Sequence, residues 1–363
     1  MKKKAVILFL SAMLAAGSLT GCGSLDESAV AVSVNDKELT ADVANFYARY
    51  MQAQYETYYG AYLGDDMWNT EAEEGETYEE SVKNAAKESL EIMLLCEEHM
   101  GDYEVSLSDG EKEEISKTAK EFAEDNSLED KEKISGSAET AERVLTLMAI
   151  QGKVQEAIEA GADTEVSDEE AAQKAMQYVF FSYTTTDDTG ASQELSEEEK
   201  AAVKENAQAF VQAVQGGDDF ATAATEYGGE LSDATFDAES VTPSEEVVAA
   251  ADSLEAGANT DVIETDAGCY VAKVTSLLDQ EATETKKAQI VDERKAQLYQ
   301  DTCDEWREEA DIKEHDSVWK KIDFNDLSVT IKQSSEEPYA DEVQTDDQAE
   351  AQENAQEIGR AHV

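Results

Sequence analysis

One long amphipathic helix is predicted late in the sequence, at residues 284–310. The side chains near one of its faces are mostly apolar: Ala288, Val291, Lys295, Leu298, Cys303 and Trp306. A helix cannot bury such a stripe alone and must pack it against other elements. The nearest apolar partners are the helical patterns before Gly161. We therefore expect the chain to leave its first domain, form a separate segment, and return through this helix.

The first domain is predicted to be mostly helical. Valine alternates with small or polar residues at 30–34, ahead of an Asn-Asp pair, which indicates a strand and a turn. Helical patterns follow at about 42–58, 78–100, 109–122 and 137–160. The predicted domain combines residues 22–165 with residues 284–324. The last apolar residues expected to complete it are Trp319, Ile322 and Phe324.

The intervening segment, residues 170–277, has a different pattern. It begins and ends in short β-rich runs, at 177–181 and 269–274, and has three helical stretches between them, at about 196–215, 220–227 and 247–254. This order fits a small α+β domain. The predicted fold class is therefore α+β, with a helical domain made from the two ends of the chain and a small α+β domain inserted into it.

The N-terminal end has the features of a secretory signal. Three lysines precede an apolar run at 5–16, which is too short to span a bilayer comfortably. The run leads to Leu19-Thr20-Gly21-Cys22, which resembles a bacterial lipobox. The resemblance implies removal of residues 1–21, lipid on Cys22, and a place on the outer face of the bacterial cell membrane. An ordinary signal peptide with a chance cysteine is the alternative.

Charge excludes several kinds of partner. The formal net charge is -56, and clustered Lys and Arg are needed to bind nucleic acid or anionic lipid. Residues 325–363 are predicted to be a disordered acidic tail, since nine acidic residues and no basic one lie between Ser334 and Glu357. Residues 358–363 equal the translation of a common sequencing-adapter read, so we hypothesise that they are an artefact.

Motifs for metal or cofactor chemistry are missing. The three histidines, His99, His315 and His362, share no ligand spacing, and no phosphate-binding glycine motif occurs. We predict no metal and no cofactor. Of the four cysteines, Cys22 is expected to carry lipid. The other three are expected to be buried, with a disulfide between Cys96 and Cys303 left open.

Five segments of the insert resemble parvulin-type peptidyl-prolyl isomerases, in the right order: 177–182, 216–224, 229–231, 250–257 and 265–271. With the lipobox and the flanking helices, the chain is similar to PrsA-like foldase lipoproteins. It is also similar to SurA-like chaperones, which share the V-N-D-x-x-L-T pattern found at residues 34–40. The resemblance implies a foldase or chaperone whose partners are unfolded or newly secreted polypeptides. The oligomeric state, including a homodimer, stays open.

The resemblance also predicts a degenerate catalytic site. The two histidines of the family's site correspond here to Tyr178 and Tyr270, and no histidine lies between His99 and His315. These tyrosines are the candidate catalytic residues, because a phenol can donate one hydrogen bond. The candidate substrate-binding residues are Pro243, Val247 and Phe236. We expect weak or no isomerase activity; an active isomerase with a rearranged site is the alternative.

Client binding is expected in the helical domain. Aromatic residues of the first helix, such as Tyr47, Tyr50 and Tyr55, are candidates for adaptable contacts with unfolded chains. The alternative for each is ordinary core packing. Cys269 is expected to pack in the insert, since no general base is adjacent in the sequence. A surface lipoprotein without chaperone activity remains the other alternative for the whole chain.

Overall fold

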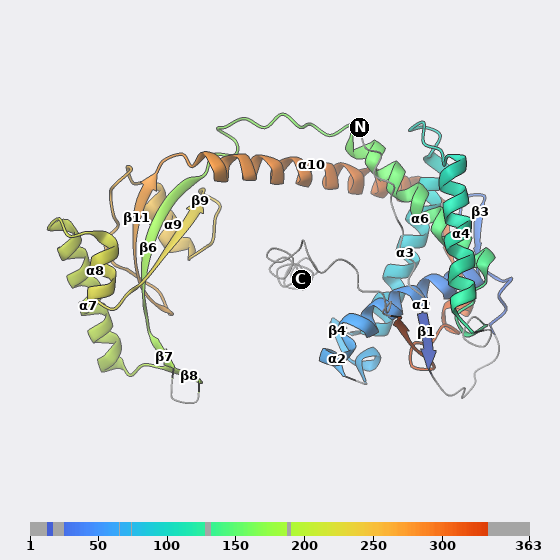
Figure 1. Ribbon diagram of the computed structural model, residues 1–363, viewed down its shortest axis with the longest axis horizontal. Helices are drawn as coiled ribbons and strands as arrows, with labels where there is room; N and C mark the ends of the chain where they lie inside the picture. The colour runs from blue at the N-terminus through green and yellow to red at the C-terminus, as the bar shows by residue number, and fades with distance from the viewer. Residues whose placement is uncertain are drawn as a thin grey trace. The chain divides into compact units, whose positions relative to one another are not determined.

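The computed structural model describes residues 13–16, 25–64, 66–73, 75–127, 132–186 and 190–332. Two compact units are present: unit 1 comprises residues 1–158 and 299–363, and unit 2 comprises residues 159–298. The helix α10 (Gln280–Glu309) begins in unit 2 and ends in unit 1 (Figure 1). Cys22 and residues 333–363 lie outside the described residues. None of the described helices is long and apolar enough to cross a membrane.

Unit 1 joins the two ends of the chain in one small sheet. Its strands are β2 (Val30–Val34), β3 (Lys37–Thr40) and β12 (Ile312–Glu314), in the order β12-β2-β3 and all antiparallel. Asn35 makes the turn after β2 with a φ of 52°, a conformation that asparagine tolerates better than most residues. Its side-chain oxygen accepts a hydrogen bond of 2.9 Å from the backbone of Asp311.

Helices form most of unit 1. They are α1 (Ala41–Tyr58), α2 (Gly60–Leu63), α3 (Tyr78–His99), α4 (Asp109–Asp125), α6 (Ala138–Glu159) and α11 (Asp316–Trp319). Capping boxes begin α3 at Thr77 and α4 at Ser108, so the first free N–H groups of both helices have partners. The connection after α2 holds a 3-10 turn (Met67–Asn69) and the strands β4 (Glu71–Glu73) and β5 (Glu76–Thr77).

The C-terminal segment completes the core of unit 1, as predicted. Trp319, Ile322 and Phe324 are buried, and the ring of Phe324 meets that of Trp68 at 4.8 Å. Gln52 of α1, itself fully buried, donates hydrogen bonds to the carbonyls of Phe324 (3.1 Å) and Leu327 (2.6 Å). These bonds satisfy a buried amide and fix the returning chain on α1.

Two expectations about the C-terminal region are wrong. Residues 325–332 do not belong to a disordered tail, because β13 (Ser328–Ile331) lies on α1: the backbone of Val329 donates to Glu56 (2.8 Å), that of Ile331 donates to Thr57 (2.9 Å), and Val329 is fully buried. In the full chain β13 also pairs with β1 (Met13–Ala16), which lies within residues 1–21, the segment that the lipobox resemblance predicts to be removed. The apolar stripe of α10 is also not buried along its length. Thr283 and Cys303, near the two ends, are the buried residues of this helix, and the predicted stripe residue Ala288 is exposed. Periodicity predicted the helix but not how much of it is covered.

Unit 2 is built on an antiparallel sheet with the order β10-β11-β6-β9. The strands are β6 (Lys174–Ser182), β9 (Glu230–Phe236), β10 (Ile263–Glu264) and β11 (Gly268–Ser276). A separate hairpin consists of β7 (Thr184–Thr186) and β8 (Ser192–Glu194). The sequence did not predict β9, because this edge strand is polar and carries few of the β-branched residues that signal a strand.

Helices cover both faces of this sheet. On one face, α7 (Glu197–Gln215) and α8 (Phe220–Glu226) bury Phe210 and Phe220 against Val179 and Phe181. On the other face, α9 (Glu245–Asp252) packs on a second cluster that includes Met176 and Val274. The predicted α+β class, with a small domain inserted into a mostly helical one, is confirmed.

Candidate functional site

The two candidate catalytic tyrosines lie on neighbouring strands of the unit 2 sheet. Tyr178 is on β6 and Tyr270 is on β11, and the register pairs Tyr270 with Phe180. Side chains alternate between the faces of a strand, so these three rings share the face that α9 covers in part. The ring centroids of Tyr178 and Tyr270 are 6.1 Å apart, and those of Phe180 and Tyr270 are 4.5 Å apart.

The three rings are partly accessible to solvent. Each is half-buried, whereas the neighbours beneath α9 are fully buried. Burial raises the pKa of Tyr270, and the nearby Tyr178 adds to the shift, so the phenol stays protonated. Across the residues that the structure describes, neither hydroxyl makes a hydrogen bond to the protein. This face of the sheet therefore presents two phenol hydroxyls that can donate hydrogen bonds, beside the apolar ring of Phe180.

The candidate substrate-binding residues have different positions. Phe236 of β9 and Val247 of α9 are both 0% exposed and belong to the core between α9 and the sheet. They cannot contact a substrate in this conformation. Pro243 is half-buried and precedes α9, where the hydroxyl of Ser244 accepts a hydrogen bond of 3.3 Å from the backbone of Val247. Phe180, which stacks on Tyr270, was missed because its role depends on strand register.

Cys269 lies on the opposite face of the sheet from Tyr270. Its thiol is 3.2 Å from the hydroxyl of Tyr183, which in turn donates to Glu264. Lys204 of α7 pairs with the same carboxylate. Burial raises the pKa of Cys269, which keeps the sulfur protonated and poorly nucleophilic. The geometry therefore favours the expected packing role over nucleophilic chemistry.

Cys96 and Cys303 are both buried in unit 1 as free thiols. The sulfur of Cys96 is 3.9 Å from the hydroxyl of Tyr299. A hydrogen bond with Cys303, together with burial, raises the pKa of Cys96. The two cysteines thus lie side by side where α3 packs against the C-terminal end of α10. The disulfide between them that the sequence left open is not formed in this structure.

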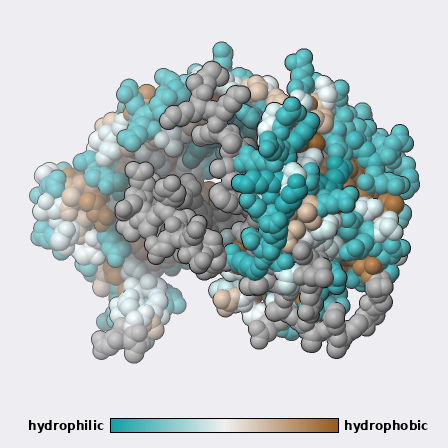
Figure 2. Space-filling model, turned by 45° about the vertical axis from the view of Figure 1, so that its right-hand side comes forward, coloured by the Kyte–Doolittle hydropathy of each residue, from teal (hydrophilic) through white to brown (hydrophobic). Residues whose placement is uncertain are grey.

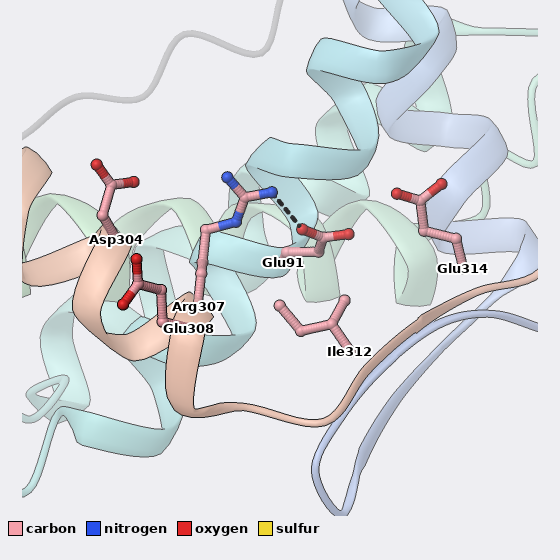
Figure 3. A pocket seen from close by; sticks show the side chains of 6 residues that line it. All are labelled: Glu91, Asp304, Arg307, Glu308, Ile312 and Glu314. Carbon is pink, nitrogen blue, oxygen red and sulfur yellow. Dashed lines mark hydrogen bonds and ion pairs between the residues drawn. The ribbon is translucent and has the colours of Figure 1, made fainter.

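A charged cavity of about 460 Å³ lies in unit 1, between α3, α10 and β12 (Figure 3). Arg307 extends from α10 and donates a hydrogen bond of 3.0 Å to Glu91, which is 2% exposed. Burial raises the pKa of Glu91, and the cavity is also lined by Asp304, Glu308, Ile312 and Glu314. This ion pair holds the returning helix on α3. No group of three or more potential metal ligands occurs in the described parts of the chain.

The candidate client-binding aromatics are less exposed than expected. Tyr47 is 8% exposed and belongs to the core of unit 1, while Tyr50 and Tyr55 are half-buried. The exposed rings lie further along, at the end of α1 and in α2: Tyr58, Tyr59 and Tyr62. Tyr59 follows Tyr55 by four residues, and Tyr62 follows Tyr58 by four. This continued helical spacing was the signal in the sequence that could have identified the exposed tyrosines. Figure 2 shows hydrophilic residues over much of the visible face.

Comparisons with known proteins support the resemblance in the insert. Residues 182–290 match the family model described as a PPIC-type PPIase domain. The resemblance to parvulin-type isomerases is therefore confirmed for this segment. The matched segment includes Tyr270 but begins after Tyr178. No curated protein sequence matches the chain.

Solved structures with some similarity include three foldases or chaperones. A SurA-like chaperone of Campylobacter jejuni has 13% identity and a TM-score of 0.30, over 79% of this chain and 99% of its own. The PrsA peptidylprolyl isomerase of Bacillus cereus has 17% identity and a TM-score of 0.30, over 68% and 91%. The foldase protein PrsA of Streptococcus pneumoniae has 18% identity and a TM-score of 0.28, over 71% and 99%.

Proposed function

We propose that this protein is a membrane-anchored extracytoplasmic foldase that binds unfolded secreted polypeptides and has weak or no prolyl isomerase activity. The match of residues 182–290 to the PPIC-type family supports the foldase assignment. The observation that carries the prediction of weak activity is the pair Tyr178 and Tyr270 at the positions of the family's two histidines. Both stand on one face of the sheet without hydrogen-bond partners in the described part of the chain.

The chemistry explains why this site is expected to be poor. Prolyl isomerisation breaks no covalent bond; its barrier of about 18–20 kcal/mol is the loss of amide resonance. A catalyst must hold the proline ring in an apolar pocket and favour the twisted amide. Phe236 and Val247, the candidate pocket residues, are buried in the core and leave the substrate no pocket there. Two phenols can donate hydrogen bonds but cannot replace that pocket.

A protease-coupled assay with a proline-containing peptide tests the isomerase prediction. The full chain is expected to accelerate cis-to-trans conversion little or not at all. Tyr178→Phe and Tyr270→Phe variants should then match the wild type. Clear acceleration that is lost in either variant would contradict the proposal and establish the alternative, an active isomerase with a rearranged site.

Chaperone activity has its own test. The full chain should suppress the aggregation of a chemically unfolded secreted protein when it is diluted into buffer at stoichiometric amounts. Weak, transient binding to exposed apolar segments is sufficient for this effect. No suppression would contradict the chaperone part of the proposal and favour a surface lipoprotein with another role.

The membrane anchor is proposed from the sequence alone. Leu19-Thr20-Gly21-Cys22 resembles a lipobox, and two or more acyl chains give stable anchoring because each buried CH₂ contributes about 0.8 kcal/mol. Metabolic labelling with an alkyne fatty acid in a bacterial host should mark the wild type and not Cys22→Ser. Equal labelling of both proteins, or labelling of neither, would contradict the anchor.

A further inference from the structure

The end of α1 and the short α2 present an exposed tyrosine surface, defined here as Tyr58, Tyr59 and Tyr62. Their side chains are 71%, 41% and 89% exposed. Among the residues that the structure describes, no other Phe, Tyr or Trp side chain is as exposed as these three. Three large aromatic side chains exposed within five residues are more typical of an interaction surface than a single exposed ring is.

One member of the tyrosine surface, Tyr59, packs on a buried base. Tyr55 lies beneath it, with ring centroids 5.6 Å from Tyr59 and 6.1 Å from Trp68. Trp68 is 6% exposed and donates a hydrogen bond of 3.0 Å to Glu56. The other oxygen of Glu56 accepts a hydrogen bond of 2.8 Å from the backbone of Val329. The ring of Tyr59 is therefore held before any partner arrives, which lowers the entropic cost of binding to it, while Tyr58 and Tyr62 project into solvent beside it.

Negative charge is concentrated in the part of the chain that carries the tyrosine surface. Nine acidic residues and no basic residue lie between Arg49 and Lys83 in the sequence. Glu56 is engaged in the base, but Asp66, Glu71 and Glu73 are exposed in the connection that follows α2. With a formal net charge of -56 for the whole chain, the potential here attracts cations and repels phosphates and carboxylates.

We propose that the tyrosine surface binds Lys- and Arg-bearing segments of unfolded polypeptides. Each open ring offers a negatively polarised face to an ammonium or guanidinium group, and nearby carboxylates add charge complementarity. This proposal rests on the proposed chaperone function and gives unit 1 a site that selects basic segments. It differs from general apolar binding, because the ring face and the partner's charge are both required.

Binding of labelled peptides to the full chain tests this proposal. The probes are a short unstructured peptide rich in arginine, the same peptide with citrulline in place of arginine, and a glutamate version. We expect the arginine peptide to bind, the other two to bind much more weakly, and binding to fall as salt is raised. The triple variant Tyr58→Leu, Tyr59→Leu, Tyr62→Leu should bind roughly tenfold more weakly, since it keeps apolar surface but loses the ring faces.

Two control variants make the test specific. Tyr58→Phe, Tyr59→Phe, Tyr62→Phe keeps the rings and should bind like the wild type. Replacing exposed aliphatic residues of unit 2, with Val241→Ser, Leu277→Ser and Leu278→Ser, removes apolar surface of another kind and should also leave arginine-peptide binding unchanged. Circular dichroism checks that each variant is folded.

Two results would overturn the proposal: equal binding of the citrulline and arginine peptides, or full binding by the leucine variant. An aggregation assay run in parallel separates this failure from failure of the proposed function. If the wild type still suppresses aggregation, only the assignment of the tyrosine surface is wrong. If it does not, the chaperone proposal itself fails.

Discussion

Two groups of aromatic side chains in this protein differ in what lies around them. In unit 2, Tyr178, Phe180 and Tyr270 lie half-buried on a sheet, with rings stacked or tilted against one another. In unit 1, Tyr58 and Tyr62 are 71% and 89% exposed. A ring surrounded by neighbours contributes to stability, whereas an open ring contributes mainly to binding. Substitutions in the two groups should therefore affect different properties.

The largest change in the free energy of unfolding is expected when a buried core side chain of unit 2, that of Phe236, is removed. Phe236 is fully buried beneath α9, so Phe236→Ala leaves a cavity and should destabilise unit 2 by about 3–5 kcal/mol. Denaturant unfolding monitored by hydrogen exchange of β6 and β11 amides measures this loss. Thr235→Ala is the matched control, because its side chain is exposed on the same strand and the change should stay within about 0.5 kcal/mol. Similar losses for both variants would contradict the placement of Phe236.

A smaller loss is expected at the aromatic face itself. Tyr270→Ala removes a half-buried ring that stacks on Phe180 at 4.5 Å, and should destabilise unit 2 by about 1–2 kcal/mol. Tyr270→Phe keeps the ring and removes a hydroxyl without a hydrogen-bond partner in the described structure, so its stability should match the wild type. The same unfolding measurement applies. A large loss in the phenylalanine variant would mean that the hydroxyl has a structural partner.

Much of the fold was predictable because local signals agree with it. Ser196 begins α7 with a capping box, and Asn35 turns β2 into β3. The return of the chain to unit 1 was predicted from the apolar stripe of α10, although Cys303 is the one stripe residue that is buried. The polar edge strand β9 and the terminal β13 were not predicted, since pairing of short strands depends on distant partners.

The candidate site was predictable only in part. Family resemblance selected Tyr178 and Tyr270, and the structure brings them together on one face. The same resemblance selected Phe236 and Val247, which the structure buries in the core. Sequence spacing gives the face of a strand or helix, but it does not tell whether another element covers that face. The exposure of a side chain therefore depends on tertiary packing that sequence spacing does not specify.

Lowering the pH should reduce the stability of unit 1 through one carboxyl group, that of Glu111. Hydrogen bonds from Lys153 and Ser108 lower the pKa of Glu111 from 4.5 to about 2. A lowered pKa in the folded state contributes stability above the unfolded value of 4.5, and this contribution is lost as the pH falls toward about 2. Because Glu111 is partly exposed, solvent screening keeps the effect below about 1 kcal/mol.

Glu111→Gln tests this titration directly. The variant should be slightly less stable than the wild type at neutral pH, and the difference should shrink below pH 4.5. Unfolding of α4 and α6, followed by hydrogen exchange, measures it in unit 1. Glu91 is the contrasting carboxyl, since burial raises its pKa and acidification there favours the folded state. A stability difference that stayed constant from neutral pH to pH 2 would contradict the role given to Glu111.

The smallest effect on stability is expected at the tyrosine surface. Tyr58→Ala removes a ring that is 71% exposed, so the free energy of unfolding should change by less than about 0.5 kcal/mol. Binding of an arginine-rich peptide should nevertheless weaken by roughly two- to fivefold, because one cation–π partner is lost. Tyr270→Ala should show the reverse, with lower stability of unit 2 and unchanged peptide binding. If both variants lost stability and binding together, the separation between a supporting and a binding aromatic group would be wrong.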